Sequence, residues 1–188
     1  YTRAIGSIKV PDSDIDFDAI NQNPLYMPDS ACAKQAAAYL QEMMEKKDSV
    51  GSTVECIITG VPAGVGEPVF DKLDAKLAQA VMSIGAVKAI EIGDGTAVTA
   101  SIGSENNDNF YMDGDTVRKR TNHSGGTLGG MSDGSPILVR ASFKPTPSIF
   151  QAQETITRAH EAITMEIKGR HDPIIGPRAV VVVESMCA

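Results

Sequence analysis

The sequence has little positive charge, few cysteines and no long apolar run, and each absence excludes a class of protein. Its formal net charge is -7, from 17 Lys and Arg against 24 Asp and Glu. Nucleic acids and anionic membranes select surfaces with many cations, so both are disfavoured as general partners. No apolar run approaches the ~20 residues of a membrane span, and no signal peptide is recognisable. The sequence therefore predicts a soluble, cytoplasmic protein in which any anionic ligand meets a local cluster of cations.

The residues of common metal and catalytic sites are also scarce. Cys32, Cys56 and Cys187 are far apart and include no Cys-x-x-Cys pair, which indicates reduced thiols and no disulfide framework. The 3 histidines lack the spacing of metal ligands, so we expect no metal site. The Gly-x-Ser-x-Gly elbow of serine hydrolases and the Gly-Lys-[Ser/Thr] sequence of phosphate loops are both missing. Hydrolase chemistry and a standard nucleotide fold are therefore disfavoured.

The length and the two ends indicate a piece of a larger subunit. The chain has 188 residues, 42% of them hydrophobic, which is enough for one core and short for two. It opens at Tyr1 without a methionine and stops at Ala188 inside an apolar pattern. We therefore expect residues 1–188 to form a single partial domain.

Hydrophobic spacing predicts helices in two regions and leaves a third open. One helix should begin at Asp29 or Ser30, and a second should begin with Pro68 in its first turn and end at Gly85. The valine-rich stretch 179–186 is compatible with strand or helix.

Strands are predicted around these helices. The stretches 52–60, 136–143 and 160–169 are β-branched or alternate between apolar and polar residues. Asp-Gly between 86–93 and 96–103 predicts a hairpin, whereas 104–134 lacks periodicity and is interpreted as one long loop. The element order predicts an α/β protein, mixed in the α+β manner, with largely antiparallel pairing.

Three motifs have residues suited to binding an anion. The stretch "NHSGGTLGGMSDGSP", 122–136, has five glycines that free the main chain to approach a flat or charged ligand; a merely flexible loop is the alternative. In "FKPTPSI", 143–149, two prolines stiffen a ribbon bearing a cation and hydroxyl groups, although prolines also protect ordinary edge strands. In "GRHDP", 169–173, Asp172 is suited to proton transfer, and an ordinary ion pair with Arg170 is the alternative.

These motifs resemble, in order and spacing, those of the chorismate synthase family. The resemblance covers "GVPAGVGEPVFDKLDAKLAQAVMSIGAVKAIEIGDG", "NHSGGTLGGMSDGSPI", "FKPTPSI" and "GRHDPIIGPRAVVVVESM", and is weaker before Gly60. It implies a lyase of the shikimate pathway that eliminates phosphate from 5-enolpyruvylshikimate-3-phosphate to give chorismate. It also implies reduced FMN as cofactor, associates the reaction with NADPH, and implies a homotetramer with a β-α-β sandwich fold.

The resemblance also assigns roles to residues of this sequence. Asp172 matches the catalytic aspartate of the family, and Arg178 is expected to bind substrate. The residues that match FMN contacts are Gly85, Ala86, Gly129, Lys144, Pro145, Thr146, Pro147, Ser148 and Arg170. The run 179–186 is expected to be helical, as in the family.

The resemblance leaves part of the family's machinery unmatched. The two catalytic histidines and several substrate arginines of the family lie in an N-terminal half that has no counterpart here. The chain therefore resembles the C-terminal portion of a subunit about twice its length, and this portion alone is expected to be inactive. A non-catalytic flavin or phosphate-binding module, or a structural domain, remains the alternative.

Overall fold

The computed structural model describes residues 1–169 and 172–188, and its chain divides into two compact units. The first unit comprises Tyr1–Val54 and Phe143–Val180, and the second comprises Glu55–Ser142 and Val181–Ala188. Strands β3 (Ser52–Ile58) and β9 (Ile137–Phe143) and helix α4 (Gly176–Cys187) have residues in both units. Each unit is described separately below.

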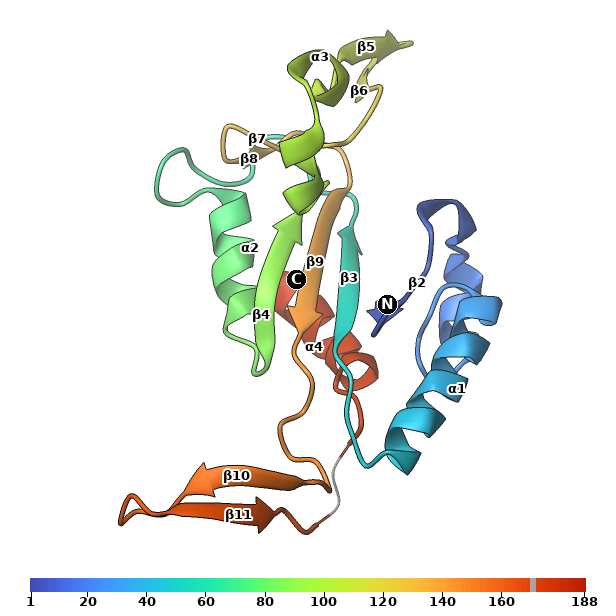
Figure 1. Cartoon of the computed structure of the whole chain (residues 1–188). Helices are drawn as coiled ribbons and strands as arrows, with labels where there is room; N and C mark the ends of the chain where they lie inside the picture. Colours follow the sequence, from blue (N-terminus) through green and yellow to red (C-terminus); the bar gives the residue numbers. More distant parts are fainter. Residues whose placement is uncertain (170–171) are drawn as a thin grey trace. The chain divides into compact units, whose positions relative to one another are not determined.

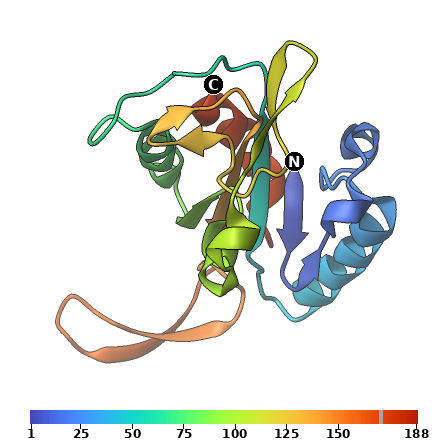
Figure 2. The ribbon, with the colours of Figure 1, turned by 90° about the horizontal axis from the view of Figure 1, so that it is seen from above.

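The first unit packs helix α1 (Ser30–Glu45) over a short antiparallel sheet. Strand β1 (Thr2–Ile5) pairs with β2 (Ile8–Lys9) on one side and with the first residues of β3 on the other. The 3₁₀ helices η1 (Asp12–Asp14) and η2 (Phe17–Gln22) lead to α1, and β10 (Ala152–Ile156) and β11 (Ala162–Glu166) form a hairpin. Figure 2 shows this hairpin as a twisted two-stranded ribbon in orange.

The core of the first unit explains why α1 forms where the sequence places it. The Asp29 carboxylate accepts a hydrogen bond from the Cys32 N–H at 2.6 Å and so caps the helix. The residues of this buried core are Ile5, Val10, Met27, Ala33, Ala36, Leu40, Val50 and Ile174. The predicted helix from Asp29 or Ser30 is thus confirmed.

The second unit is built on the neighbouring strands β3, β9 and β4 (Val87–Ile92). In Figure 1 the arrow of β9 points opposite to those of β3 and β4. The other elements of this unit are α2 (Leu73–Met82), η3 (Gly95–Ala100), α3 (Gly103–Asn106), β5 (Phe110–Asp113), β6 (Thr116–Lys119), β7 (Thr127–Leu128) and β8 (Met131–Ser132). Strand β9 alternates as predicted, with Ile137, Val139 and Ala141 buried.

The predicted hairpin between 86–93 and 96–103 is wrong. Only the first segment is a strand, β4, and it neighbours β9, whereas residues 95–100 form the 3₁₀ helix η3. Glu91 stabilises this helix, because its Oε1 accepts hydrogen bonds from the N–H and hydroxyl of Thr96 at 3.1 and 2.9 Å. The side chain of Asp94 instead pairs with His123.

Two other predictions need correction. Helix α2 begins at Leu73 and not at Pro68, because residues 67–71 close a turn through the Glu67 N–H and the Asp71 carbonyl, and Phe70 is 89% exposed. The interval 104–134 is not one structureless loop, since it contains the hairpins β5–β6 and β7–β8. Helix α4 confirms the helical expectation for 179–186. No helix among the residues with described structure is long and apolar enough to cross a membrane.

Candidate functional site

The predicted ribbon Lys144–Ser148 follows β9 directly and is held by the segment that precedes β3. The Ser49 hydroxyl donates a hydrogen bond to the Thr146 carbonyl at 2.7 Å. Gly51 lies so close that a Cβ there would approach the Phe143 carbonyl oxygen to 2.8 Å. The ribbon is thus fixed by the packing of the first unit and not only by its prolines.

Thr146 supplies the most direct indication that this ribbon meets a ligand. Its hydroxyl oxygen is buried and has no hydrogen-bond partner in the structure. An unpaired buried hydroxyl is unfavourable by about 1–3 kcal/mol, so a polar ligand group at this position would be stabilised. Lys144 is exposed on the same ribbon and offers a cation. These residues fit the polar and phosphate-bearing parts of a flavin nucleotide.

Ser148 and Asp172 line one cavity of about 120 Å³ in the first unit. The residue that follows Asp172 is held in place, because the Val50 N–H donates a hydrogen bond to the Pro173 carbonyl at 2.9 Å. Lys47 and Ser49 also contribute to the cavity wall. The structure therefore brings two of the predicted site residues together, although they lie far apart in the sequence.

Asp172 also forms an ion pair with Arg178, in the first turn of α4. The Asp172 Oδ2 and Arg178 Nη1 atoms are 2.8 Å apart, and the two side chains are 42% and 71% exposed. An exposed pair of this kind stabilises the fold by about 0–1 kcal/mol. Arg178 keeps further guanidinium N–H groups for an anionic ligand. Arg170, the partner predicted for Asp172, lies outside the described residues.

In the second unit, Asp108 organises the glycine-rich stretch. Its carboxylate accepts hydrogen bonds from the N–H groups of His123 and Ser124 at 2.8 and 3.0 Å and from the Thr121 hydroxyl at 2.8 Å. Burial by itself would raise the pKa of Asp108, but these hydrogen bonds outweigh it and hold the pKa well below its ordinary value. The start of this stretch is therefore ordered by the protein's own contacts.

Lys119 extends this network into the interior. Its ammonium lies 3.2 Å from Asp108 Oδ2 and 2.6 Å from Asp133 Oδ2, and all three side chains are at most 6% exposed. Burial tends to raise the pKa of Asp133, whereas Lys119 and Ser135 lower it, and the net direction is downward. Sequence reasoning missed this cluster, because "ENNDN" gives no basis for choosing one acid.

A second missed feature is the pair between Asp94 and His123. Asp94 Oδ2 and His123 Nδ1 are 2.6 Å apart, and the Asp94 N–H donates to the His123 carbonyl at 2.9 Å. Gly93 and Gly125 make this approach feasible, since a Cβ on Gly93 would overlap the carbonyl oxygen of His123. Both glycines have positive φ, 59° and 65°.

Gly93→Ala is expected to lower the free energy of unfolding by at least about 2 kcal/mol, because it adds a steric clash to an unfavourable φ. Gly114→Ala is the matched control. Gly114 has a φ of 60° and open space around its Cβ position. Denaturant unfolding of both variants separates the clash from the backbone strain, and equal losses would contradict the packing argument.

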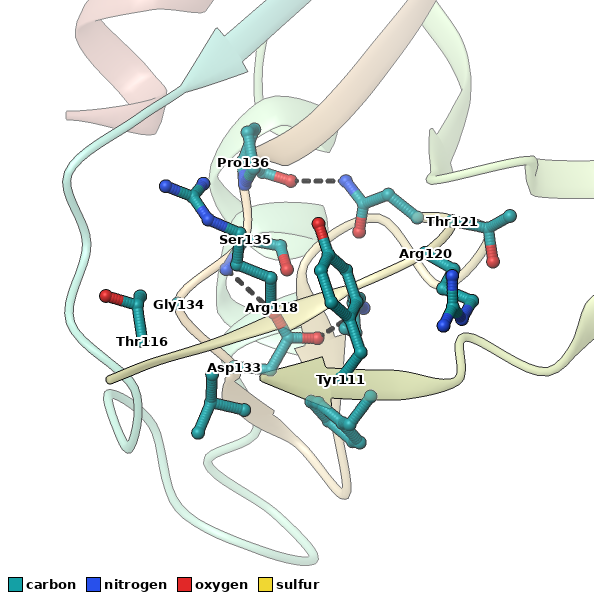
Figure 3. Close-up of a pocket in the computed structure, with 13 residues that line it drawn as sticks. Tyr111, Thr116, Arg118, Arg120, Thr121, Asp133, Gly134, Ser135 and Pro136 are labelled. Carbon is teal, nitrogen blue, oxygen red and sulfur yellow. Dashed lines mark hydrogen bonds and ion pairs between the residues drawn. The ribbon is translucent and has the colours of Figure 1, made fainter. Parts of the chain in front are cut away.

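A cavity of about 500 Å³ in the second unit lies against β5 and β6 (Figure 3). Residues 110–111, 116–122 and 133–136 line it. The Arg120 guanidinium lies 5.0 Å from the centroid of the Tyr111 ring, and Arg118 pairs with Asp113 at 2.7 Å. Of the cations in 118–120, Arg118 and Lys119 are thus paired with carboxylates of the unit, whereas Arg120 keeps its charge beside the Tyr111 ring.

The remaining predicted flavin contacts lie at opposite ends of α2. Gly130, next to Gly129, accepts a hydrogen bond from the Leu73 N–H at the start of the helix, whereas Gly85 and Ala86 follow its end. A helix of this length spans about 15 Å. Ala86 has a φ of 71°, an uncommon conformation for a residue with a Cβ. The structure does not bring these two groups of residues together.

Comparison with known proteins relates the whole chain to one family. The profile of the chorismate synthase family matches residues 1–188. Chorismate synthases of Agathobacter rectalis and Synechocystis sp. are 55% and 44% identical to it over all of its length, and that of Methanococcus maripaludis is 48% identical over 92%. The chain spans 51%, 53% and 46% of these relatives, or about half their length.

The fold agrees with this relationship. A crystal structure of chorismate synthase superposes with a TM-score of 0.79 over 99% of this chain and 52% of its own, at 26% identity. The mixed architecture with antiparallel pairing predicted from the sequence is thereby confirmed. From the family match over its full length and the shared fold, the chain belongs to the chorismate synthase family.

Proposed function

We propose that this chain supplies part of the active site of a chorismate synthase. The reaction eliminates phosphate from C3 and hydrogen from C6 of 5-enolpyruvylshikimate-3-phosphate and gives chorismate. The observation that carries the proposal is the cavity shared by Ser148 and Asp172, beside Arg178, in a chain of this family.

The substrate and cofactor classes agree with the groups around this cavity. The substrate has two carboxylates and a phosphate, so its binding requires fixed cations, which an acidic protein must place locally. Arg178 is suited to this role, because it lies beside Asp172 and most of its side chain is exposed. Reduced FMN, when bound, would supply electron density that helps the allylic phosphate leave.

The residues of the ribbon would hold the cofactor, and Asp172 would handle the proton. Thr146 would donate or accept a hydrogen bond through its unpaired hydroxyl, while Lys144 and Ser148 would bind polar or phosphate groups. Asp172, restrained by the anchored Pro173, would accept or steer a proton at a fixed position. We retain Gly85, Ala86, Gly129, Pro145, Pro147 and Arg170 as proposed flavin contacts.

The size of the cavity indicates that this chain does not enclose the ligands alone. Ligand pockets typically measure about 300–1,000 Å³, whereas the cavity beside Asp172 measures about 120 Å³. We therefore propose that residues outside this chain complete the site, within a longer subunit of a cytoplasmic homotetramer. The half-length coverage of the relatives supports this proposal.

Assayed alone, the 188-residue chain is expected to form no chorismate, because catalytic groups that act as a unit leave only a residual rate when members are removed. The assay would supply reduced FMN and 5-enolpyruvylshikimate-3-phosphate. A cooperative thermal melt of the same preparation would serve as the folding control. Turnover close to that of a full-length relative would refute the proposal that the site is incomplete.

A further inference from the structure

The cavity beside the β5–β6 hairpin is not used by the proposed reaction. Its volume of about 500 Å³ lies within the range of about 300–1,000 Å³ that is typical of ligand pockets. The described residues that line it include none of the flavin or substrate contacts proposed above. All of them belong to the second unit, so one compact part of the chain forms the whole cavity. The cavity is therefore a candidate binding site in its own right.

The charges at this cavity are unequally compensated. Arg118 and Lys119 both pair with carboxylates of the unit. Arg120 instead lies over the Tyr111 ring, with its guanidinium carbon 5.0 Å from the ring centroid. In the part of the chain that the structure describes, no carboxylate pairs with Arg120. The cavity thus offers a ligand one uncompensated positive charge.

The aromatic ring and the two arginines lie on one face of the hairpin. Tyr111 and Arg118 are opposite one another in the register of β5 and β6, and Arg120 comes two positions after Arg118 and lies over the same ring. Figure 3 draws the three side chains at the cavity. A guanidinium placed over a ring still has N–H groups along its edge, and these can donate two parallel hydrogen bonds to a carboxylate or a phosphate.

Buried contacts hold another wall of the cavity, residues 133–136, in place. The Asp133 carboxylate accepts a hydrogen bond from the Lys119 ammonium at 2.6 Å. The Asn122 side-chain amide donates to the Pro136 carbonyl at 2.7 Å. Both contacts tie this wall to the segment that carries the arginines. A wall that is already formed reduces the entropy lost on binding, so a small ligand can bind without reorganising the unit.

We propose that this cavity binds a small aromatic anion, namely a ring that carries a single carboxylate or phosphate group. Arg120 binds the anionic group, and the remaining N–H groups of Arg118 are further donors. The Tyr111 ring and Pro136 provide apolar surface for the ring of the ligand. An inorganic anion alone would leave most of the cavity unfilled, so an organic ligand is favoured. The proposal does not depend on the proposed reaction.

The test is isothermal titration calorimetry of a full-length protein that carries this chain, with benzoate and with phenyl phosphate as probes. At least one probe should bind saturably, and the tighter of the two identifies the preferred anionic group. Benzamide keeps the ring without the charge, whereas acetate and inorganic phosphate keep the charge without the ring. Each of these should bind about tenfold or more weakly than the matching probe. Equal affinity for any of them, or no saturable binding of either probe, would overturn the proposal.

Two variants and one local measurement assign the binding to this cavity. Arg120→Gln removes the uncompensated charge and should weaken binding of the tighter probe about tenfold or more. Arg158→Gln is the matched control, because Arg158 is an exposed arginine of the first unit, between β10 and β11, and its loss should leave the affinity unchanged.

Hydrogen exchange read by mass spectrometry locates the probe in the native protein. Peptides that cover residues 109–122 should become protected when the probe is added. Protection confined to peptides of 143–149 and 172–187 would place the probe at the proposed active site and refute a site beside β5 and β6. Unchanged affinity in Arg120→Gln would refute it as well.

Discussion

Asp172→Asn in a full-length protein that carries this chain is expected to lower turnover at least about a hundredfold, with little change in FMN affinity or melting temperature. Positioned general acids and bases contribute typically 10²- to 10⁴-fold in rate. The stability effect should be small, because the ion pair with Arg178 is 42% and 71% exposed and such pairs are worth about 0–1 kcal/mol. Steady-state kinetics, FMN titration and thermal melting measure the three quantities.

Asp113→Asn is the matched control for this substitution. Asp113 also pairs with an arginine, Arg118 at 2.7 Å, and both side chains are more than half exposed. Its replacement should leave turnover unchanged. If Asp172→Asn stays within a few-fold of the parent, Asp172 is an ordinary ion-pair residue, and the non-catalytic flavin-binding alternative gains support. Loss of FMN binding in parallel with turnover would also contradict the proton-transfer role.

Elements with a strong hydrophobic period were predictable from the sequence. Helix α1 and strand β9 bury the faces that their periodicity indicates, and the β-branched stretch 52–60 contains β3. Each of these elements has its own local signal, either a capping residue or a clear alternation. Local signals are sufficient to predict an element where the spacing of its apolar residues directly identifies its buried face.

The errors occurred where distant contacts override a local turn signal. Asp94 and Gly95 form the strongest hairpin signal of the chain, yet Asp94 binds His123 and Glu91 stabilises η3. Strand β4 lies beside β9 in the sheet, and β9 follows it by more than forty positions in the sequence. The local sequence does not indicate these distant partners, so the prediction that 96–103 form the second strand of a hairpin was wrong.

The candidate site was predictable only in part. The family resemblance selected Ser148 and Asp172, and the structure places both at one cavity. It gave no signal for Lys47 and Ser49, which reach the cavity from the segment before β3. Their participation depends on how β9 and that segment pack, as the hydrogen bond from Ser49 to the Thr146 carbonyl shows.

The buried cluster of Asp108, Lys119 and Asp133 leads to the largest expected stability effect. Asp108→Asn should lower the free energy of unfolding by about 3 kcal/mol at about pH 7, because an amide N–H₂ would face the donors that the carboxylate now accepts. Hydrogen exchange at the amides of His123 and Ser124, which both donate to Asp108, should accelerate. Asp113→Asn, at an exposed pair, again serves as the control.

The pH dependence of the same substitution tests the electrostatic cause. The pKa of Asp108 is lowered on folding, so its contribution to stability is complete above the ordinary aspartate pKa of 3.8 and is lost as the pH falls towards the lower folded value. The difference in unfolding free energy between the native protein and Asp108→Asn should therefore be full at about pH 7 and smaller at about pH 3. Denaturant unfolding at the two pH values measures this difference. If this difference in unfolding free energy is the same at both pH values, Asp108 stabilises the fold through its shape and neutral hydrogen bonds. The ionised carboxylate, which Lys119 and the backbone N–H groups surround, would then not be the cause.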